Sequence, residues 1–182
     1  MTTSSSLAVL ELFFGSATQY YVTGRFAVLA GQSPVAGNLL HHAVEMYLKG
    51  GLSKARSLRQ LKQLSHRLPA VWPEFKQEFS ACDLDEFDSV VAALHEFEEL
   101  RYPDFIAAHG ARITMGIEPF GPMGPQSASR TEPNYQLFLD DVDALVRAVF
   151  SAVPVNPQFF LGSLPFRARE SLLHANKQNW AG

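Results

Sequence analysis

Apolar residues recur at helical spacing along most of the chain, and residues 34–52 show this pattern best. Five apolar positions in the stretch fall on one face of a helix, at the i, i+3, i+4, i+7, i+8 spacing of a buried stripe. They are Leu40, Ala43, Val44, Tyr47 and Leu48. A polar row on the opposite side is expected to face solvent. It consists of Asn38, His42, Glu45 and Lys49. Ser33-Pro34 predicts the start of this helix and Gly50-Gly51 its end.

The same periodicity predicts further helices on either side of this one. A long first helix is expected at about residues 6–29. A basic helix is expected to begin at Ser53, its N-cap, and another helix or pair of short turns surrounds Pro69 and Pro73. Helices therefore account for most of the first half of the chain.

A further apolar stripe begins after Asp83. Glu86, three residues later, completes a capping-box pattern that predicts the start of a helix. This helix must end near Arg101, because Pro103 disfavours the helical conformation at Tyr102.

Residues from about 103 to 132 are rich in glycine and proline and are expected to form one long irregular loop, a kind of segment that is usually functional. Within it, residues 112–117 could form a short strand. Helices are predicted again over residues 133–182, the first opening at Pro133. The whole chain, residues 1–182, is thus interpreted as a single all-α domain, an antiparallel helical bundle of about five to six helices with strands minimal or absent.

Composition narrows the functional classes. The formal net charge is −3 and 47% of the residues are hydrophobic, which does not by itself indicate a nucleic-acid-binding protein. Cys82 is the single cysteine, and the first residues lack the pattern of a secretory signal. No stretch approaches the roughly 18 consecutive apolar residues of a membrane span. We therefore expect a cytoplasmic protein with no membrane partner.

Three stretches, in this order, resemble the HEPN superfamily: "HHAVEMYLKGGL", "LKQLSHRLPAVW" and "FEELRYPD". Glu45 and Lys49 match the Glu-x-x-x-Lys pattern of that family. His66 matches a histidine that precedes an apolar helix start, and residues 101–103 match an Arg-Tyr-Pro step that ends a later helix. The resemblance covers about residues 16–104.

The resemblance implies an antiparallel helical bundle, frequent homodimerisation, and work on nucleotides or RNA. Many members of the superfamily look like metal-independent ribonucleases of toxin or defence systems that use an Arg-x(4 to 6)-His motif. Others are accessory domains, often beside a minimal nucleotidyltransferase. In that superfamily the Arg-x(4 to 6)-His motif usually lies at the start of a late helix. This sequence lacks it there, because Arg101 and His109 are too far apart and Pro103 lies between them.

Looser versions of the motif exist elsewhere. Arg59 and His66 have six residues between them, and Arg169 and His174 have four, but either pair can arise by chance. His66 and Arg59 are the catalytic candidates. A neutral histidine can accept the 2′-hydroxyl proton of RNA while an arginine holds the scissile phosphate, so that no metal or cofactor is required.

A basic pocket for the phosphate of a nucleotide or of RNA is the second candidate site. The resemblance and the charges assign it to Lys49, His66, Arg101 and Tyr102. The alternative is that these are ordinary surface charges that pair with neighbouring glutamates.

The sequence does not predict a metal site at the adjacent His41 and His42. Glu45 lies one turn from His41, but a metal needs more protein ligands than this spacing supplies.

The leading hypothesis is a HEPN-like protein that binds nucleotide or RNA phosphate, with or without ribonuclease activity. The alternatives are a non-catalytic dimerisation or interaction module, or the helical partner of a separately encoded nucleotidyltransferase. A homodimer and an antitoxin partner are also expected.

Overall fold

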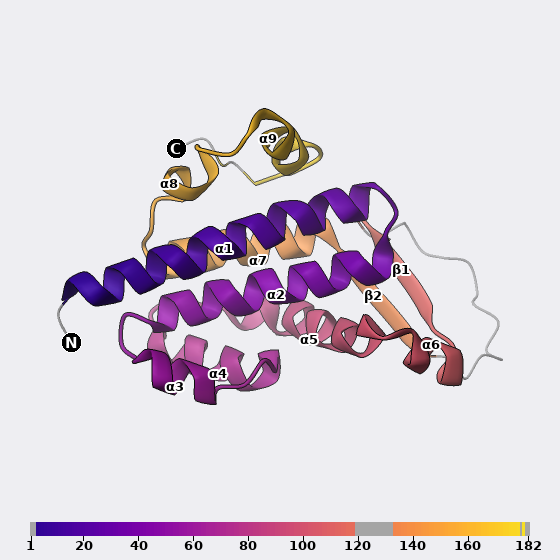
Figure 1. Cartoon of the computed structure of the whole chain (residues 1–182), viewed down its shortest axis with the longest axis horizontal. Helices are drawn as coiled ribbons and strands as arrows, with labels where there is room; N and C mark the ends of the chain where they lie inside the picture. Colours follow the sequence, from indigo (N-terminus) through magenta and orange to yellow (C-terminus); the bar gives the residue numbers. More distant parts are fainter. Residues whose placement is uncertain (1–2, 119–132, 179, 181–182) are drawn as a thin grey trace.

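The computed structural model describes residues 3–118, 133–178 and 180, and these residues are mostly helical with one small sheet (Figure 1). In chain order the elements are α1 (Thr3–Leu29), α2 (Ser33–Leu52), α3 (Leu58–Gln63), α4 (Leu68–Glu78), η1 (Asp85–Phe87), α5 (Asp88–Glu96), η2 (Phe97–Arg101), α6 (Pro103–His109), β1 (Arg112–Gly116), β2 (Asn134–Phe138), α7 (Leu139–Ala152), α8 (Pro157–Leu161) and α9 (Phe166–Leu173). The predicted helical class is confirmed.

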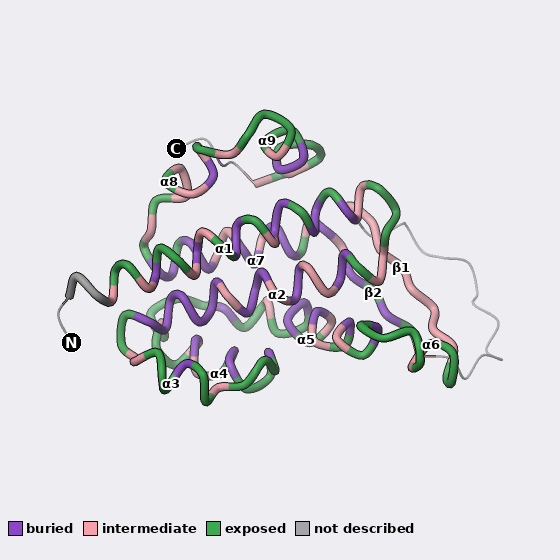
Figure 2. Tube along the Cα trace, viewed as in Figure 1, coloured by how far each residue is buried: buried purple, intermediate pink, exposed green. Residues whose placement is uncertain are grey.

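The helices α1 and α2 form a long hairpin, and α7 packs along it (Figure 1). At its centre the rings of Phe14, Tyr47 and Phe150 meet edge to face, with centroids 5.1 to 5.2 Å apart. Each such aromatic pair adds about 0.5 to 1.5 kcal/mol to the stabilisation from burial alone. Figure 2 shows the buried positions concentrated where α1, α2 and α7 face one another. This contact is the middle of the hydrophobic core.

Two glycines that were expected to end α2 lie inside it instead. The helix continues to Leu52, and both Gly50 and Gly51 are buried. A methyl group added at Gly50 would lie 2.7 Å from a ring carbon of Phe14, and one at Gly51 would lie 2.7 Å from Phe75. The prediction was wrong because these glycines allow close packing of α2 on its neighbours, rather than a left-handed turn.

The segment after Pro103 is more ordered than predicted. Tyr102 is extended, as expected before a proline, but Pro103 then begins α6. The short strand expected at residues 112–117 is confirmed as β1. The remainder of the predicted irregular loop, residues 119–132, lies outside the described residues.

The helix predicted from Pro133 begins later than expected, because residues 134–138 form β2, paired in parallel with β1. Along β2, Tyr135 and Leu137 are buried while Asn134 and Gln136 are exposed. This alternation is typical of a half-buried strand. The helix α7 starts only at Leu139.

Two predicted helix caps were also placed differently. Ser57, rather than Ser53, is the N-cap of α3, and it forms a capping box with Gln60. Asp83 and Glu86 form no such box: Asp83 accepts a hydrogen bond from the backbone N–H of Asp85, and the one-turn helix η1 precedes α5.

None of the described helices combines the length and the apolar character that a membrane span needs.

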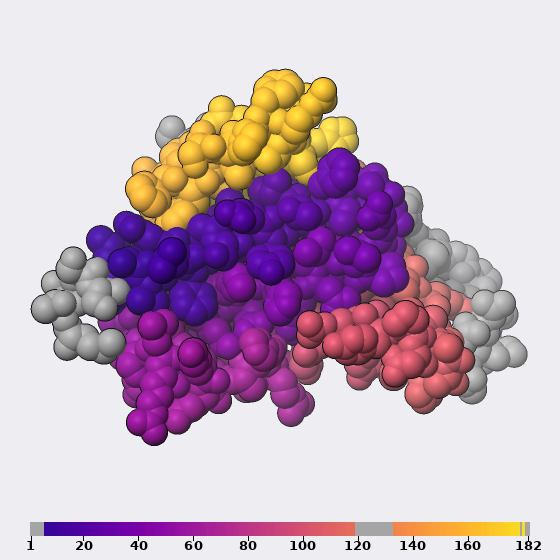
Figure 3. Space-filling view, in the orientation of Figure 1, coloured from indigo at the N-terminus to yellow at the C-terminus, as the bar shows by residue number. Residues whose placement is uncertain are grey.

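The C-terminal elements α8 and α9 lie on α1 (Figure 3) and are attached to it through a buried charge. Arg25 on α1 is completely buried and forms an ion pair with Asp143 on α7. Two of its other N–H groups donate to the carbonyl oxygens of Ser171 and His174, at 3.2 and 2.8 Å. Tyr21 donates its hydroxyl to Asp143 at 2.5 Å. One guanidinium therefore joins α1, α7 and the end of α9.

Candidate functional site

The polar row of α2 is largely buried, which corrects the expectation that it faces solvent. The side chains of Glu45 and Lys49 are 5% and 8% exposed. They are covered by the turn at residues 65–66, which joins α3 to α4. Only Asn38 and His42 are partly exposed. A buried charged pair on α2 thus faces the turn that carries the sequence-predicted His66.

Lys49 stabilises that turn. Its ammonium group donates to Glu45 at 2.8 Å and to the backbone carbonyl of Ser65. Ser65 has φ = +57°, a left-handed conformation that is unfavourable for a residue with a side chain. Its hydroxyl accepts a hydrogen bond from the backbone N–H of Arg67 at 3.3 Å. Lys49 therefore holds the strained residue that precedes His66 in place.

Glu45 orients the imidazole of His66. Oε1 of Glu45 lies 2.9 Å from Nδ1 of His66, and Oε2 lies 3.4 Å from Nδ1 of His42. Burial alone would raise the pKa of Glu45, but hydrogen bonds from His42 and Lys49 and the charges of Lys49 and His66 lower it to about 2. A carboxylate only accepts hydrogen bonds, so Nδ1 of His66 carries a proton and Nε2 is free to act as an acceptor in the neutral ring.

His66 and Arg101 line the same pocket, which has a volume of about 270 Å³. The pocket lies between α2, the turn before α4, and η2. Its other lining residues are Val35, Asn38, Leu39, His41, His42 and Glu98. The side chain of His66 is 75% exposed, so a ligand can reach it. This pocket therefore brings together two of the cationic or imidazole residues that the sequence analysis assigned to phosphate binding.

The other assigned residues lie differently. Lys49 is held by Glu45 and Ser65 beneath the pocket, where it supports the site instead of lining it. Tyr102 is exposed, and the guanidinium of Arg101 lies 5.6 Å from the centre of its ring. Arg59 is exposed on α3 and is not among the residues that line the pocket with His66.

The second Arg-x(4)-His match is not assembled into one site. Arg169 donates to the carbonyl oxygen of Gly162 and lines a small pocket with Trp180. His174 instead lines a groove between α1 and α9, and its carbonyl accepts a hydrogen bond from Arg25.

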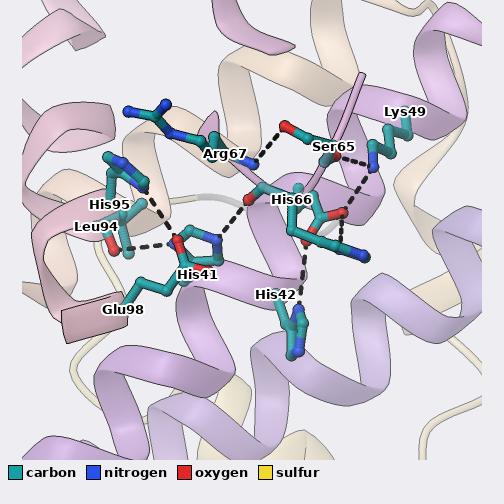
Figure 4. Close-up of polar contacts among 10 residues, drawn as sticks. His41, His42, Lys49, Ser65, His66, Arg67, Leu94, His95 and Glu98 are labelled. Carbon is teal, nitrogen blue, oxygen red and sulfur yellow. Dashed lines mark hydrogen bonds and ion pairs between the residues drawn. The ribbon is translucent and has the colours of Figure 1, made fainter. Parts of the chain in front are cut away.

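Two residues that the sequence analysis assigned to no site, His95 and Glu98, lie at the pocket, and Glu98 is one of its lining residues. His95 and Glu98 stand three residues apart, on α5 and η2, and both lie next to His41 of α2 (Figure 4). The ligand atoms of the three side chains all lie within 4.8 Å of one another. The His-x-x-Glu spacing was visible in the sequence, but its proximity to His41 depends on how η2 packs against α2.

That packing depends on a glycine. A methyl group added at Gly37 of α2 would lie 2.2 Å from a ring carbon of Phe97, the first residue of η2. The absence of a side chain at Gly37 lets η2 approach α2, which places Glu98 and Arg101 next to His41 and His66.

Comparison of the chain with models of protein families, with curated proteins and with solved structures found no match.

Proposed function

We propose that the protein is a HEPN-like helical-bundle protein that binds the phosphate of a nucleotide or of RNA in the pocket between α2 and η2. The observation that supports this most is that His66 and Arg101, 35 positions apart in the sequence, line one pocket. Its volume of about 270 Å³ is slightly below the roughly 300 to 1,000 Å³ of small-molecule sites. It suits a phosphate with part of its nucleoside.

The chemistry of the lining residues supports an anionic ligand. Arg101 is always charged and can donate two parallel hydrogen bonds to phosphate oxygens. Nδ1 of His66 and Nδ1 of His42 both face Glu45, which also pairs with Lys49, so each ring can donate from Nε2 to a phosphate only in its protonated form. The negative charge nearest to His66 is therefore already paired, which favours entry of a phosphate.

The same arrangement suits cleavage of RNA without a metal. Nε2 of His66 would take the proton of a 2′-hydroxyl, whose oxygen then attacks phosphorus to give a cyclic phosphate as the bond to the 5′-oxygen breaks. The 5′-oxygen takes a proton from solvent water as it leaves, and Arg101 offsets the charge on the phosphate oxygens. In this assignment Arg101 replaces Arg59 as the partner of His66.

Binding is tested by fluorescence anisotropy with labelled single-stranded RNA and with a labelled nucleotide, on protein treated with EDTA. Arg101→Gln should weaken binding about tenfold, because a hydrogen bond to a charged group is lost. Arg167→Gln removes the same charge from an exposed position on α9 and should leave binding unchanged. Equal affinities of the two variants would contradict the proposed pocket.

Cleavage is tested on the same RNA in the presence of EDTA. His66→Ala should abolish cutting, whereas Arg59→Ala should retain it. Loss of activity in Arg59→Ala with retention in Arg101→Gln would favour the pair predicted from the sequence. If the wild-type protein binds RNA but does not cut it, the function is phosphate binding alone.

The interaction-module alternative rests on a different surface. A groove of about 900 Å³ between α1 and α9 is bordered by the exposed apolar residues Phe26 and Leu173. If the protein binds neither RNA nor nucleotide and is a dimer in sedimentation experiments that Phe26→Ser converts to a monomer, this alternative is the better description.

A further inference from the structure

His41, His95 and Glu98 bring together two imidazoles and one carboxylate from three elements. Their side chains point toward one another, with ligand atoms no more than 4.8 Å apart (Figure 4). His41 is buried on α2, whereas His95 and Glu98 are partly exposed. Two imidazole nitrogens and a carboxylate oxygen form a donor set that zinc and other divalent transition metals bind in proteins.

Both ring nitrogens of His41 face backbone carbonyl oxygens, so one of them must turn away from its carbonyl to bind a metal. Its Nδ1 lies 3.1 Å from the carbonyl oxygen of Leu94, and its Nε2 lies 3.1 Å from the carbonyl oxygen of His66. A neutral imidazole has one N–H group, so it can donate to only one of these acceptors. The lone pair of its other nitrogen is then left facing an oxygen. A metal-bound histidine commonly coordinates through one nitrogen and donates from the other to a backbone carbonyl.

His95 supplies an independent observation. Its Nδ1 atom is buried and has no hydrogen-bond partner among the described residues. It lies 3.3 Å from Oε2 of Glu98. Burial lowers the pKa of His95, an effect that Glu98 opposes and that His41 and Arg67 reinforce. The unpartnered Nδ1 atom of His95 therefore has a position at which it can coordinate a metal.

We propose that His41, His95 and Glu98 form a binding site for a divalent transition metal, of which Zn²⁺ is the best fit. Ligand atoms around a tetrahedral zinc ion, each about 2.0 to 2.1 Å from the metal, stand about 3.4 Å apart. His95 and Glu98 already meet this separation at 3.3 Å, whereas the other ligand atoms, up to 4.8 Å apart, must move about 1.4 Å closer when the ion binds. Mg²⁺ prefers oxygen ligands and is a poor fit.

Three protein ligands leave one coordination position open, as in catalytic zinc sites and unlike closed structural ones. His41 and Glu98 both line the pocket that contains His66 and Arg101, so the open position would be reached from that pocket. The metal site does not depend on the proposed phosphate binding, because its ligands are different residues. If both hold, an anion in the pocket could complete the coordination of the metal.

The test uses untagged, EDTA-treated protein of full length. Zn²⁺ binding is measured by competition with a chromophoric chelator, and Co²⁺ binding by the visible absorption of the ion. We expect one ion per chain and at least a tenfold loss of affinity in both His95→Ala and Glu98→Gln. His109→Ala removes an exposed histidine on α6, outside the cluster, and should bind as the wild type does.

His66→Ala separates this proposal from the proposed function, since it should lose RNA binding or cleavage and keep Zn²⁺. Circular dichroism checks that each variant is folded. If His95→Ala does not fold, Glu98→Gln, a near-isosteric change, is used for the test instead. Failure of the wild type to bind Zn²⁺ or Co²⁺ would overturn the site. So would affinities in His95→Ala and Glu98→Gln equal to that of His109→Ala.

Discussion

Two groups of charged residues are buried in the part of the chain that the structure describes, and they differ in whether solvent can reach them. The network around Arg25 is closed: the guanidinium is 0% exposed, and its partners Asp143, Ser171 and His174 belong to the chain itself. The network around Glu45 has one open side, since the ring of His66 that it orients is 75% exposed.

The comparison separates two uses of a buried charge. A closed network whose donors and acceptors are all satisfied contributes to the arrangement of helices and leaves nothing for a ligand. An open network holds one member in a fixed orientation at the edge of a pocket, which is how binding sites are preorganised. The Arg25 network therefore has a structural role, and the Glu45 network is the better candidate for function.

The largest effect on stability is expected when the counter-charge of Arg25 is removed. Asp143→Leu leaves the guanidinium of Arg25 buried without a counter-charge, which should reduce the free energy of unfolding by about 3 to 5 kcal/mol. The double variant Arg25→Met/Asp143→Leu removes both charges and should recover much of this loss. Urea unfolding monitored by circular dichroism measures both. A single variant as stable as the wild type would show that the ion pair is not needed.

The next largest effect is a loss of stability at low pH, caused by protonation of Glu45 in the open network. The pKa of Glu45 is about 2 in the folded protein and 4.5 in an unperturbed carboxyl group. The ionised form thus stabilises the fold above pH 4.5, and this contribution is lost as the pH falls from about 4.5 to about 2. The free energy of unfolding should drop by up to about 3 kcal/mol over this range.

Glu45→Gln provides the control, because glutamine does not titrate. The variant should be less stable than the wild type at pH 7, and the difference should shrink as the pH approaches 2. Urea unfolding across this pH range measures it, and parallel curves for the two proteins would argue against a paired Glu45.

A smaller effect is expected from a substitution next to the pocket, which does not touch the Arg25 network. Gly37→Ala places a methyl group against Phe97 and should cost about 1 to 3 kcal/mol by overpacking. It should also weaken ligand binding in the pocket, because η2 must move away from α2. Gly15→Ala, where an added methyl group meets nothing within 4 Å, should instead stabilise α1 by up to about 1 kcal/mol. Thermal unfolding and the RNA or Zn²⁺ titrations test both.

Much of the fold follows from local patterns. The buried stripe of α2 could be predicted because it depends only on the spacing of apolar residues. The end of η2 at Arg101 could be predicted because it depends on Pro103. The role of Gly50 could not, since it depends on Phe14 of another helix. The strand β2 was missed because its partner β1 lies more than 20 positions earlier in the chain.

The candidate site was predictable to a lesser extent. His66 and Arg101 were chosen from the sequence, and the structure places them in one pocket. The burial of Lys49 could not be foreseen, because it requires the 65–66 turn to fold over α2. The cluster of His41 with His95 and Glu98 likewise depends on contacts between helices, which helical periodicity does not specify.

The partners of Arg25 also bear on how the chain folds during its synthesis. Asp143 is 118 positions downstream, and the carbonyl of His174 is 149 positions downstream. At about 5 to 20 residues per second, a ribosome needs roughly 6 to 24 s to make the first of these partners after Arg25. Until then the guanidinium must stay hydrated, so the hairpin of α1 and α2 cannot reach its native burial while the nascent chain is short. Completion of the core is therefore delayed until residue 174 has been made.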